Sequence, residues 1–205
     1  MDPNLQLMFY LIPTIVGFLL ILPFGRSLVD PFTEKFPSLG NERGRVFFGL
    51  ILTCLAGVAV SFQTLWISSK ISEGGNFCAS NSILSCDDVI GNSNYNTDPI
   101  FGIPWGGIGA VVFCILLYLV YSSSKEPNAN WVSSYLKLGT YITFAGFFVI
   151  ALLIYYEIQM GIEIGKPIII CQYCTTAHFA SIAAFIGFLR LMRMNDSIWW
   201  NKTSK

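Results

Sequence analysis

Six cysteines are the residues of this chain whose types and spacing suit chemistry. Four of them form two pairs: Cys78 with Cys86 in a polar segment, and Cys171 with Cys174 in the pattern Cys-x-x-Cys. In the first turn of a helix, that spacing brings two sulfurs within bonding distance while one stays accessible. Peptide N–H groups at a helix start favour the thiolate, which is the nucleophile of disulfide exchange. We therefore predict a helix that begins just before Cys171, and thiol–disulfide chemistry at all four cysteines.

Two structural explanations of these cysteines remain open. Cys78 and Cys86 could be a staple that restrains a loop, accompanied by an unrelated second disulfide. A four-thiolate zinc site is the other alternative, although zinc ligands usually come in closely spaced pairs and seven residues separate Cys78 from Cys86. Cys54 and Cys114 lie within apolar runs, where a thiol behaves as a small hydrophobe, and we predict that they are structural.

The elements that must position these cysteines are five apolar runs without Asp, Glu, Lys or Arg. Of the 205 residues, 54% are hydrophobic and 12% are charged, whereas a soluble domain carries about 25% charged residues. Each run is close to the roughly 20 residues that span a bilayer as a helix. The sequence therefore predicts an all-α integral membrane protein with five transmembrane helices, over Leu5 to Phe24, Val46 to Ile67, Phe101 to Tyr121, Leu138 to Tyr156 and Ile168 to Leu189.

The charges exclude one class of partner and predict an orientation. The 12 basic and 12 acidic residues balance, which argues against nucleic acid as a partner. All Lys and Arg residues except Lys70 and Lys166 flank one side of the predicted bundle, and that side is expected to be cytoplasmic. The loop 68–100 and a short turn from Glu157 to Pro167 then lie together on the extracytoplasmic face with both cysteine pairs. The loop is rich in Gly, Asn and Ser, and we expect it to be irregular and exposed.

The single histidine lies on the same predicted helix as the Cys-x-x-Cys motif. In an α-helix, Cys171, Cys174 and His178 share one face. A polar ring in hydrocarbon is costly unless it has a partner, so His178 is a candidate hydrogen-bond donor to the carbonyl of a ligand. The alternative is a core histidine that Thr175 or Thr176 satisfies.

Two electrons that leave a dithiol inside a membrane need a lipid-soluble acceptor. The chain has no haem-attachment motif, no dinucleotide fingerprint and no iron–sulfur cysteine spacing. A quinone meets the requirement, and a quinone-linked membrane route keeps bacterial periplasms oxidising. We therefore expect a quinone of the menaquinone, ubiquinone or vitamin K type.

The order of these motifs resembles the vitamin K epoxide reductase family, in its prokaryotic form, over about residues 46–192. The resemblance implies a four-helix bundle around a quinone, with one additional N-terminal helix. The expected organisation is an added helix with a cytoplasmic connector over 1–45, the family domain over 46–192 and a cytoplasmic tail over 193–205. The motifs that carry the likeness are Cys78-x7-Cys86, Phe101-Gly102-Ile103-Pro104, and Cys171-x-x-Cys174 with Thr176 and His178 after it.

The resemblance also implies a role for each cysteine. Cys174 is similar to the residue that meets the quinone, and Cys171 to the one that exchanges with the loop. Cys86 is similar to the loop partner of Cys171, and Cys78 to the outermost sulfur, which receives electrons.

Three further residues match positions at the quinone in that family. His178 lies where the family places a donor to the quinone carbonyl. Phe101 is the first residue of the motif that opens the third predicted span, and Asp98 lies three residues before it. For Asp98, a solvated loop carboxylate is the alternative explanation.

The expected function is that of a quinone-dependent thiol oxidase in a prokaryotic cell membrane. It would reoxidise a thioredoxin-like partner on the extracytoplasmic side and so support disulfide formation. The alternatives are an epoxide reductase of a vitamin K cycle in the endoplasmic reticulum, and a membrane protein whose cysteines only staple loops.

Overall fold

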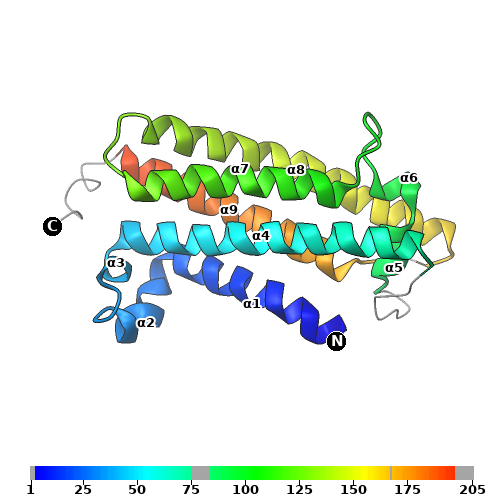
Figure 1. Cartoon of the computed structure of the whole chain (residues 1–205), viewed down its shortest axis with the longest axis horizontal. Coiled ribbons are helices and arrows are strands. Elements are labelled where there is room, and N and C mark those ends of the chain that lie inside the picture. Colours follow the sequence, from blue (N-terminus) through cyan, green and yellow to red (C-terminus); the bar gives the residue numbers. More distant parts are fainter. Residues whose placement is uncertain (1–2, 75–83, 167, 197–205) are drawn as a thin grey trace.

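The structure, a computed structural model, describes residues 3–74, 84–166 and 168–196. Five long helices run alongside one another in these ranges (Figure 1). They are α1 (Pro3–Ile21), α4 (Glu42–Ser72), α7 (Trp105–Lys125), α8 (Val132–Glu163) and α9 (Gln172–Asn195). Short helices connect α1 to α4, namely η1 (Pro23–Gly25), α2 (Arg26–Val29), η2 (Asp30–Phe32) and α3 (Pro37–Gly40). Two more, α5 (Cys86–Gly91) and α6 (Ser93–Asn96), lie between α4 and α7.

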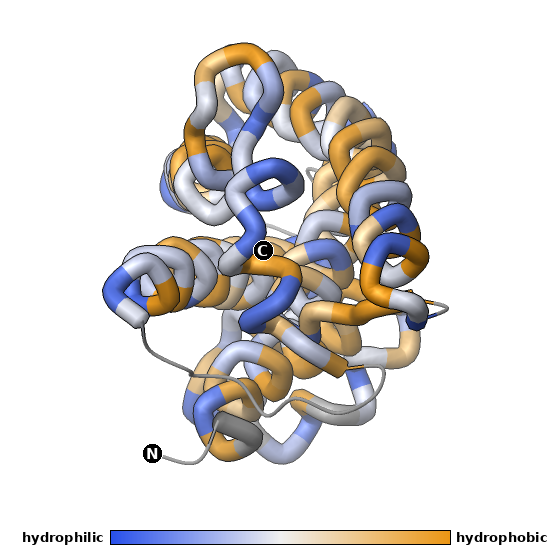
Figure 2. The backbone as a smooth tube through the Cα atoms, turned by 90° about the vertical axis from the view of Figure 1, so that its right-hand side faces the viewer, coloured by the Kyte–Doolittle hydropathy of each residue, from blue (hydrophilic) through white to orange (hydrophobic). Residues whose placement is uncertain are grey.

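The long helices are those of a multi-pass integral membrane protein. Among the described residues, α4, α7, α8 and α9 are long and apolar enough to cross a membrane, and α1 adds a shorter apolar helix over Leu5–Ile21. Large apolar side chains also point away from the bundle, and Val111 and Phe148 are 61% and 70% exposed. Figure 2 shows hydrophobic positions along all sides of the bundle. Such faces are stable in lipid but not in water. The prediction of an all-α membrane protein is confirmed.

The turn predicted from Glu157 to Pro167 is wrong over its first half. Helix α8 continues through Glu157 and ends at Glu163, and Gly165 follows with a positive φ of 74°. Glutamate, glutamine and methionine are good helix formers, so the helix persists after the apolar run ends. It stops where a glycine adopts the left-handed conformation that other residues avoid.

The outer loop is more ordered than its composition predicts. The side chain of Ser85 accepts a hydrogen bond from the N–H of Asp88 at 3.3 Å and so caps α5. Cys86 and Ile90 on this helix are buried rather than exposed. The polar composition therefore predicts the exposed face of this segment but not the face that packs against the bundle.

Helix α4 lies at the centre of the bundle and packs against α1, α7 and α9. Gly57 on α4 permits a close approach, because a Cβ atom there would lie 2.4 Å from the ring of Phe113 on α7. The core contains buried side chains from all five long helices, among them Ile21, Val46, Leu50, Cys54, Phe113, Leu116, Leu136 and Phe188. This packing fixes the walls of the cavity described below.

Helix α1 contacts the bundle at its C-terminal end and near its middle. Buried Arg45 of α4 donates to the carbonyl oxygens of Leu20 and Leu22, at 3.0 and 2.7 Å, and so satisfies the C-terminal end of α1. Near the middle of the helix, Tyr10 packs edge-on against Tyr173, inside the Cys-x-x-Cys motif. The N-terminal helix therefore contacts the segment that carries the Cys-x-x-Cys motif.

Candidate active site

A short backbone pairing brings two cysteine segments together. Leu84 and Ile170 form a parallel bridge, and the N–H of Ser85 donates to the carbonyl oxygen of Ile170 at 3.3 Å. Cys86 begins α5 shortly after Leu84, and Cys171 directly follows Ile170. Both cysteines consequently enter one buried cluster at the same end of the bundle.

Cys171 caps the helix that carries Cys174. It has extended backbone angles, and its Sγ accepts the N–H of Cys174 at 3.3 Å. Its carbonyl oxygen accepts the N–H of Thr175 at 2.9 Å, so α9 starts at Gln172. The helix therefore begins directly after Cys171, one residue later than the spacing predicts.

Three sulfurs meet at this point. The Cys171 thiol hydrogen-bonds with the thiols of Cys174 and Cys86. Cys171 is fully buried, Cys86 is 3% exposed and Cys174 is half-buried. Cys171 thus lies between a loop cysteine on one side and its Cys-x-x-Cys partner on the other.

Burial works against the thiolate that the sequence predicts at the Cys-x-x-Cys motif. Burial, together with the hydrogen bonds to Cys174 and Cys86, raises the pKa of Cys171 well above its ordinary value. Desolvation of a buried sulfur outweighs the effect of nearby peptide N–H groups. Any exchange at this sulfur must therefore supply or remove a proton.

The remaining cysteines divide into two kinds. Cys54 is fully buried in α4, as predicted for a structural residue, whereas Cys114 of α7 is exposed on the outer face of the bundle. Cys78 lies outside the described residues. Within the described ranges, no group of three or more His, Cys, Asp or Glu side chains is arranged to hold a metal ion.

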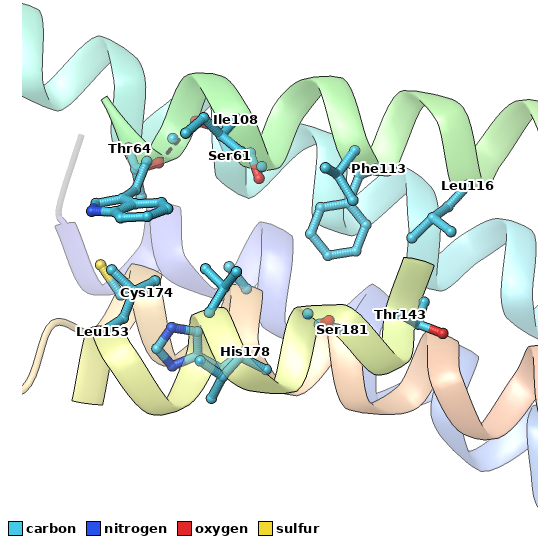
Figure 3. Close-up of a pocket in the computed structure, with 18 of the residues that line it drawn as sticks. Ser61, Thr64, Ile108, Phe113, Leu116, Thr143, Leu153, Cys174, His178 and Ser181 are labelled. Carbon is cyan, nitrogen blue, oxygen red and sulfur yellow. Dashed lines mark hydrogen bonds between the residues drawn. The ribbon is translucent and has the colours of Figure 1, made fainter. Parts of the chain in front are cut away.

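Next to the sulfurs, a cavity of about 150 Å³ lies among the long helices (Figure 3). An apolar cavity of about this size accommodates one six-membered aromatic ring. Cys174 lies at one end of the cavity, His178 is beside it, and Phe113 and Leu116 lie farther in (Figure 3). The walls are mostly apolar, with a few polar side chains from Ser61, Thr64, Trp105, Thr143 and Ser181.

Two buried nitrogens in the lining have no hydrogen-bond partner, namely Nε2 of His178 and Nε1 of Trp105. Thr175 and Thr176 do not satisfy His178, because their hydroxyls donate to the carbonyl oxygens of Cys171 and Gln172. Buried polar groups are nearly always paired, so these nitrogens indicate a missing ligand. A ring that carries carbonyl oxygens, as a quinone does, fits both the space and the unpaired nitrogens.

Trp105 was not predicted from the sequence. Its signal is its place directly after Pro104, at the first residue of α7, where an amphipathic indole ring suits the membrane interface. In this segment, the family resemblance implied Phe101 as the residue at the quinone. Trp105 is the residue of this segment that reaches the cavity.

Asp98 and Phe101 do not line the cavity. The Asp98 carboxylate accepts the N–H groups of Ile100, Phe101 and Ile103 at 2.9 to 3.0 Å, and it is 7% exposed. The hydrogen bonds from Phe101 and Ile103 lower the pKa of Asp98. Asp98 is thus a loop carboxylate, but not a solvated one: it organises the turn before α7. Phe101 is 78% exposed at the tip of that turn.

Among the comparisons with known proteins, a family model matches this chain. No curated protein and no solved structure matched the chain. The model of the vitamin K epoxide reductase family matches residues 49–188, which include α7, α8, most of α4 and α9, and every cysteine discussed above. This match extends over well more than half of the chain, so the protein belongs to the vitamin K epoxide reductase family, whose members are oxidoreductases of membrane thiols and quinones.

Proposed function

We propose that this protein oxidises the thiols of a thioredoxin-like partner outside the cytoplasm and passes the electrons to a membrane quinone. One observation carries the proposal: Cys171 contacts both Cys86 and Cys174, and Cys174 faces a ring-sized cavity with two unpaired nitrogens. The excess of Lys and Arg on the opposite side of the bundle supports an outward-facing active site.

The proposed relay consists of thiolate attacks through mixed disulfides. A partner dithiol reduces the Cys78–Cys86 disulfide, and Cys86 then attacks Cys171 in the Cys171–Cys174 disulfide. The Cys86–Cys171 bond forms, and Cys174 leaves as a thiolate. Cys78 next attacks Cys86, which restores the loop disulfide and releases Cys171.

Residues of this chain would hold the quinone next to Cys174, so that the Cys171–Cys174 disulfide can form again. His178 and Trp105 would hold the quinone by its carbonyl oxygens, and the apolar walls would exclude water. When bound, the quinone supplies a two-electron acceptor that becomes the quinol with two protons. Electrons and protons balance, because one partner dithiol becomes a disulfide for each quinone that is reduced to the quinol.

The test is turnover of the purified protein with a reduced thioredoxin-like protein or dithiothreitol, and with menaquinone or ubiquinone analogues. We expect quinone absorbance to fall in step with loss of free thiol. The absence of quinone reduction by the wild-type protein would overturn the proposal. Reduction of the quinone epoxide alone would instead favour the epoxide reductase.

Removal of either unpaired nitrogen is expected to weaken quinone binding. His178→Phe and Trp105→Phe keep an aromatic ring but lose a hydrogen-bonding nitrogen. Each should raise KM for the quinone about tenfold, the cost of one buried carbonyl left unpaired. Steady-state kinetics at varied quinone concentration measures this change.

Tyr141→Phe is the matched control, since Tyr141 of α8 is 69% exposed on the outer face. It should leave KM unchanged. Wild-type KM in both cavity variants would show that the nitrogens do not bind the acceptor.

A further inference from the structure

One buried carboxylate lies beside the sulfur cluster. Glu157, near the C-terminal end of α8, is 6% exposed, and its Oε1 accepts the N–H of Cys171 at 3.2 Å. It also interacts electrostatically with Cys86. Ionisable side chains in membrane-spanning helices are costly, and where they occur they are usually functional.

No cation balances this carboxylate in the part of the chain that the structure describes. The ion pairs found there are Arg26–Asp30, Lys70–Glu73 and Arg190–Glu42. Glu157 is therefore not held in a salt bridge, and its charge is free to change during a reaction.

Glu157 also shares a second, smaller cavity with Cys174. This space of about 40 Å³ lies between Glu157 and Cys174 and exceeds the roughly 10–15 Å³ that one water molecule needs. The other titratable groups on it are Tyr95 of α6 and Tyr156 of α8. Glu157 thus lies beside the three described cysteines of the relay: it accepts the backbone N–H of Cys171, interacts electrostatically with Cys86 and shares a cavity with Cys174.

We propose that Glu157 is the proton acceptor for the exchange between Cys86 and Cys171, an inference that rests on the proposed function. In this step the Cys86 sulfur bonds to the Cys171 sulfur and the Cys171–Cys174 bond breaks. The electron pair of that bond leaves with Cys174 as a thiolate, and the Cys86 proton moves to the Glu157 carboxylate. The same proton is then available to Cys171 when Cys78 releases it from the mixed disulfide.

The competing role for Glu157 is purely structural, as an acceptor that holds the Cys171 N–H. Glu157→Gln separates the two roles, because glutamine keeps the size and the accepting oxygen but takes no proton. Glu163→Gln is the matched control: Glu163 lies on the same helix, is exposed, hydrogen-bonds with Tyr95 and lines neither cavity.

The experiment mixes oxidised, quinone-free full-length protein with dithiothreitol, quenches it with acid and measures loss of the Cys171–Cys174 disulfide by alkylation and mass spectrometry. Glu157→Gln should slow this exchange about 100-fold, within the range for removal of a general base. Its rate should then rise about tenfold per pH unit, as hydroxide replaces the lost base, whereas the wild-type rate changes less steeply. Glu163→Gln should match the wild type.

Glu157→Ala provides a second measurement of the role of Glu157 if the glutamine variant fails to fold. Formate should restore part of its exchange rate, because the deleted side chain and the adjacent cavity leave room for a small carboxylate. Wild-type exchange in Glu157→Gln, or no response of Glu157→Ala to formate, would overturn the proposal. Rapid exchange without quinone reduction in the wild type would instead refute the proposed function and leave the role of Glu157 standing.

Discussion

Replacement of Cys174 by serine is expected to abolish quinone reduction while the first exchange step persists. Of the described sulfurs in the relay, Cys174 is the one that lines the cavity of about 150 Å³. A serine hydroxyl cannot give up electrons to form a disulfide, so turnover should fall by at least about 1,000-fold, as when a reacting group is removed from an enzyme. Quinone absorbance during turnover with dithiothreitol measures the loss.

The same variant should also reveal the order of the relay. In Cys174→Ser, the Cys171 thiol has lost its own disulfide partner and remains in contact with Cys86. It can attack Cys86 of the Cys78–Cys86 disulfide and release Cys78 as a thiol, so peptide mapping of the variant isolated without reductant should detect a Cys86–Cys171 disulfide. Cys114→Ser, on the outer face of α7, is the control and should retain full turnover. More than about a tenth of wild-type activity in Cys174→Ser would contradict the assignment of Cys174 as the sulfur that meets the quinone.

The long helices were predictable because the lipid environment excludes charged residues from the segments that span it. A span must exclude charge over its whole width, so the charge-free runs mark α4, α7, α8 and α9. The Cys-x-x-Cys motif and His178 followed from spacing alone, because helical periodicity places them on one face. The structure places Cys174 and His178 on the same cavity.

Other parts of the site produce no such pattern in the sequence. Glu157 was assigned to a turn because it is the first charge after an apolar run, and hydropathy does not show where a helix ends. The pairing of Leu84 with Ile170 is a single backbone contact between distant segments, which produces no pattern in either. Asp98 was expected at the quinone by likeness, but three local N–H groups occupy its carboxylate instead.

Replacement of Cys86 by serine is expected to stop turnover with every thiol donor, small or large. Cys171 has no exposed surface, and Cys86 is in contact with it. Cys174 is half-buried and faces the two cavities within the bundle. A reductant in water therefore reaches the Cys171–Cys174 disulfide through Cys86, and Cys86→Ser should lower turnover about 100-fold or more, since exchange depends on access to the attacked sulfur.

The informative comparison is between a reduced thioredoxin-like protein and dithiothreitol as donors for Cys86→Ser, with Cys114→Ser as the matched cysteine control. A docking defect would spare the small dithiol, whereas loss of the loop sulfur that contacts Cys171 should affect both donors equally. Near-normal turnover with dithiothreitol would show that Cys171 or Cys174 is open to water. If neither donor supports turnover, burial of Cys171 sets the order of the reaction, because electrons then reach the quinone site through Cys86.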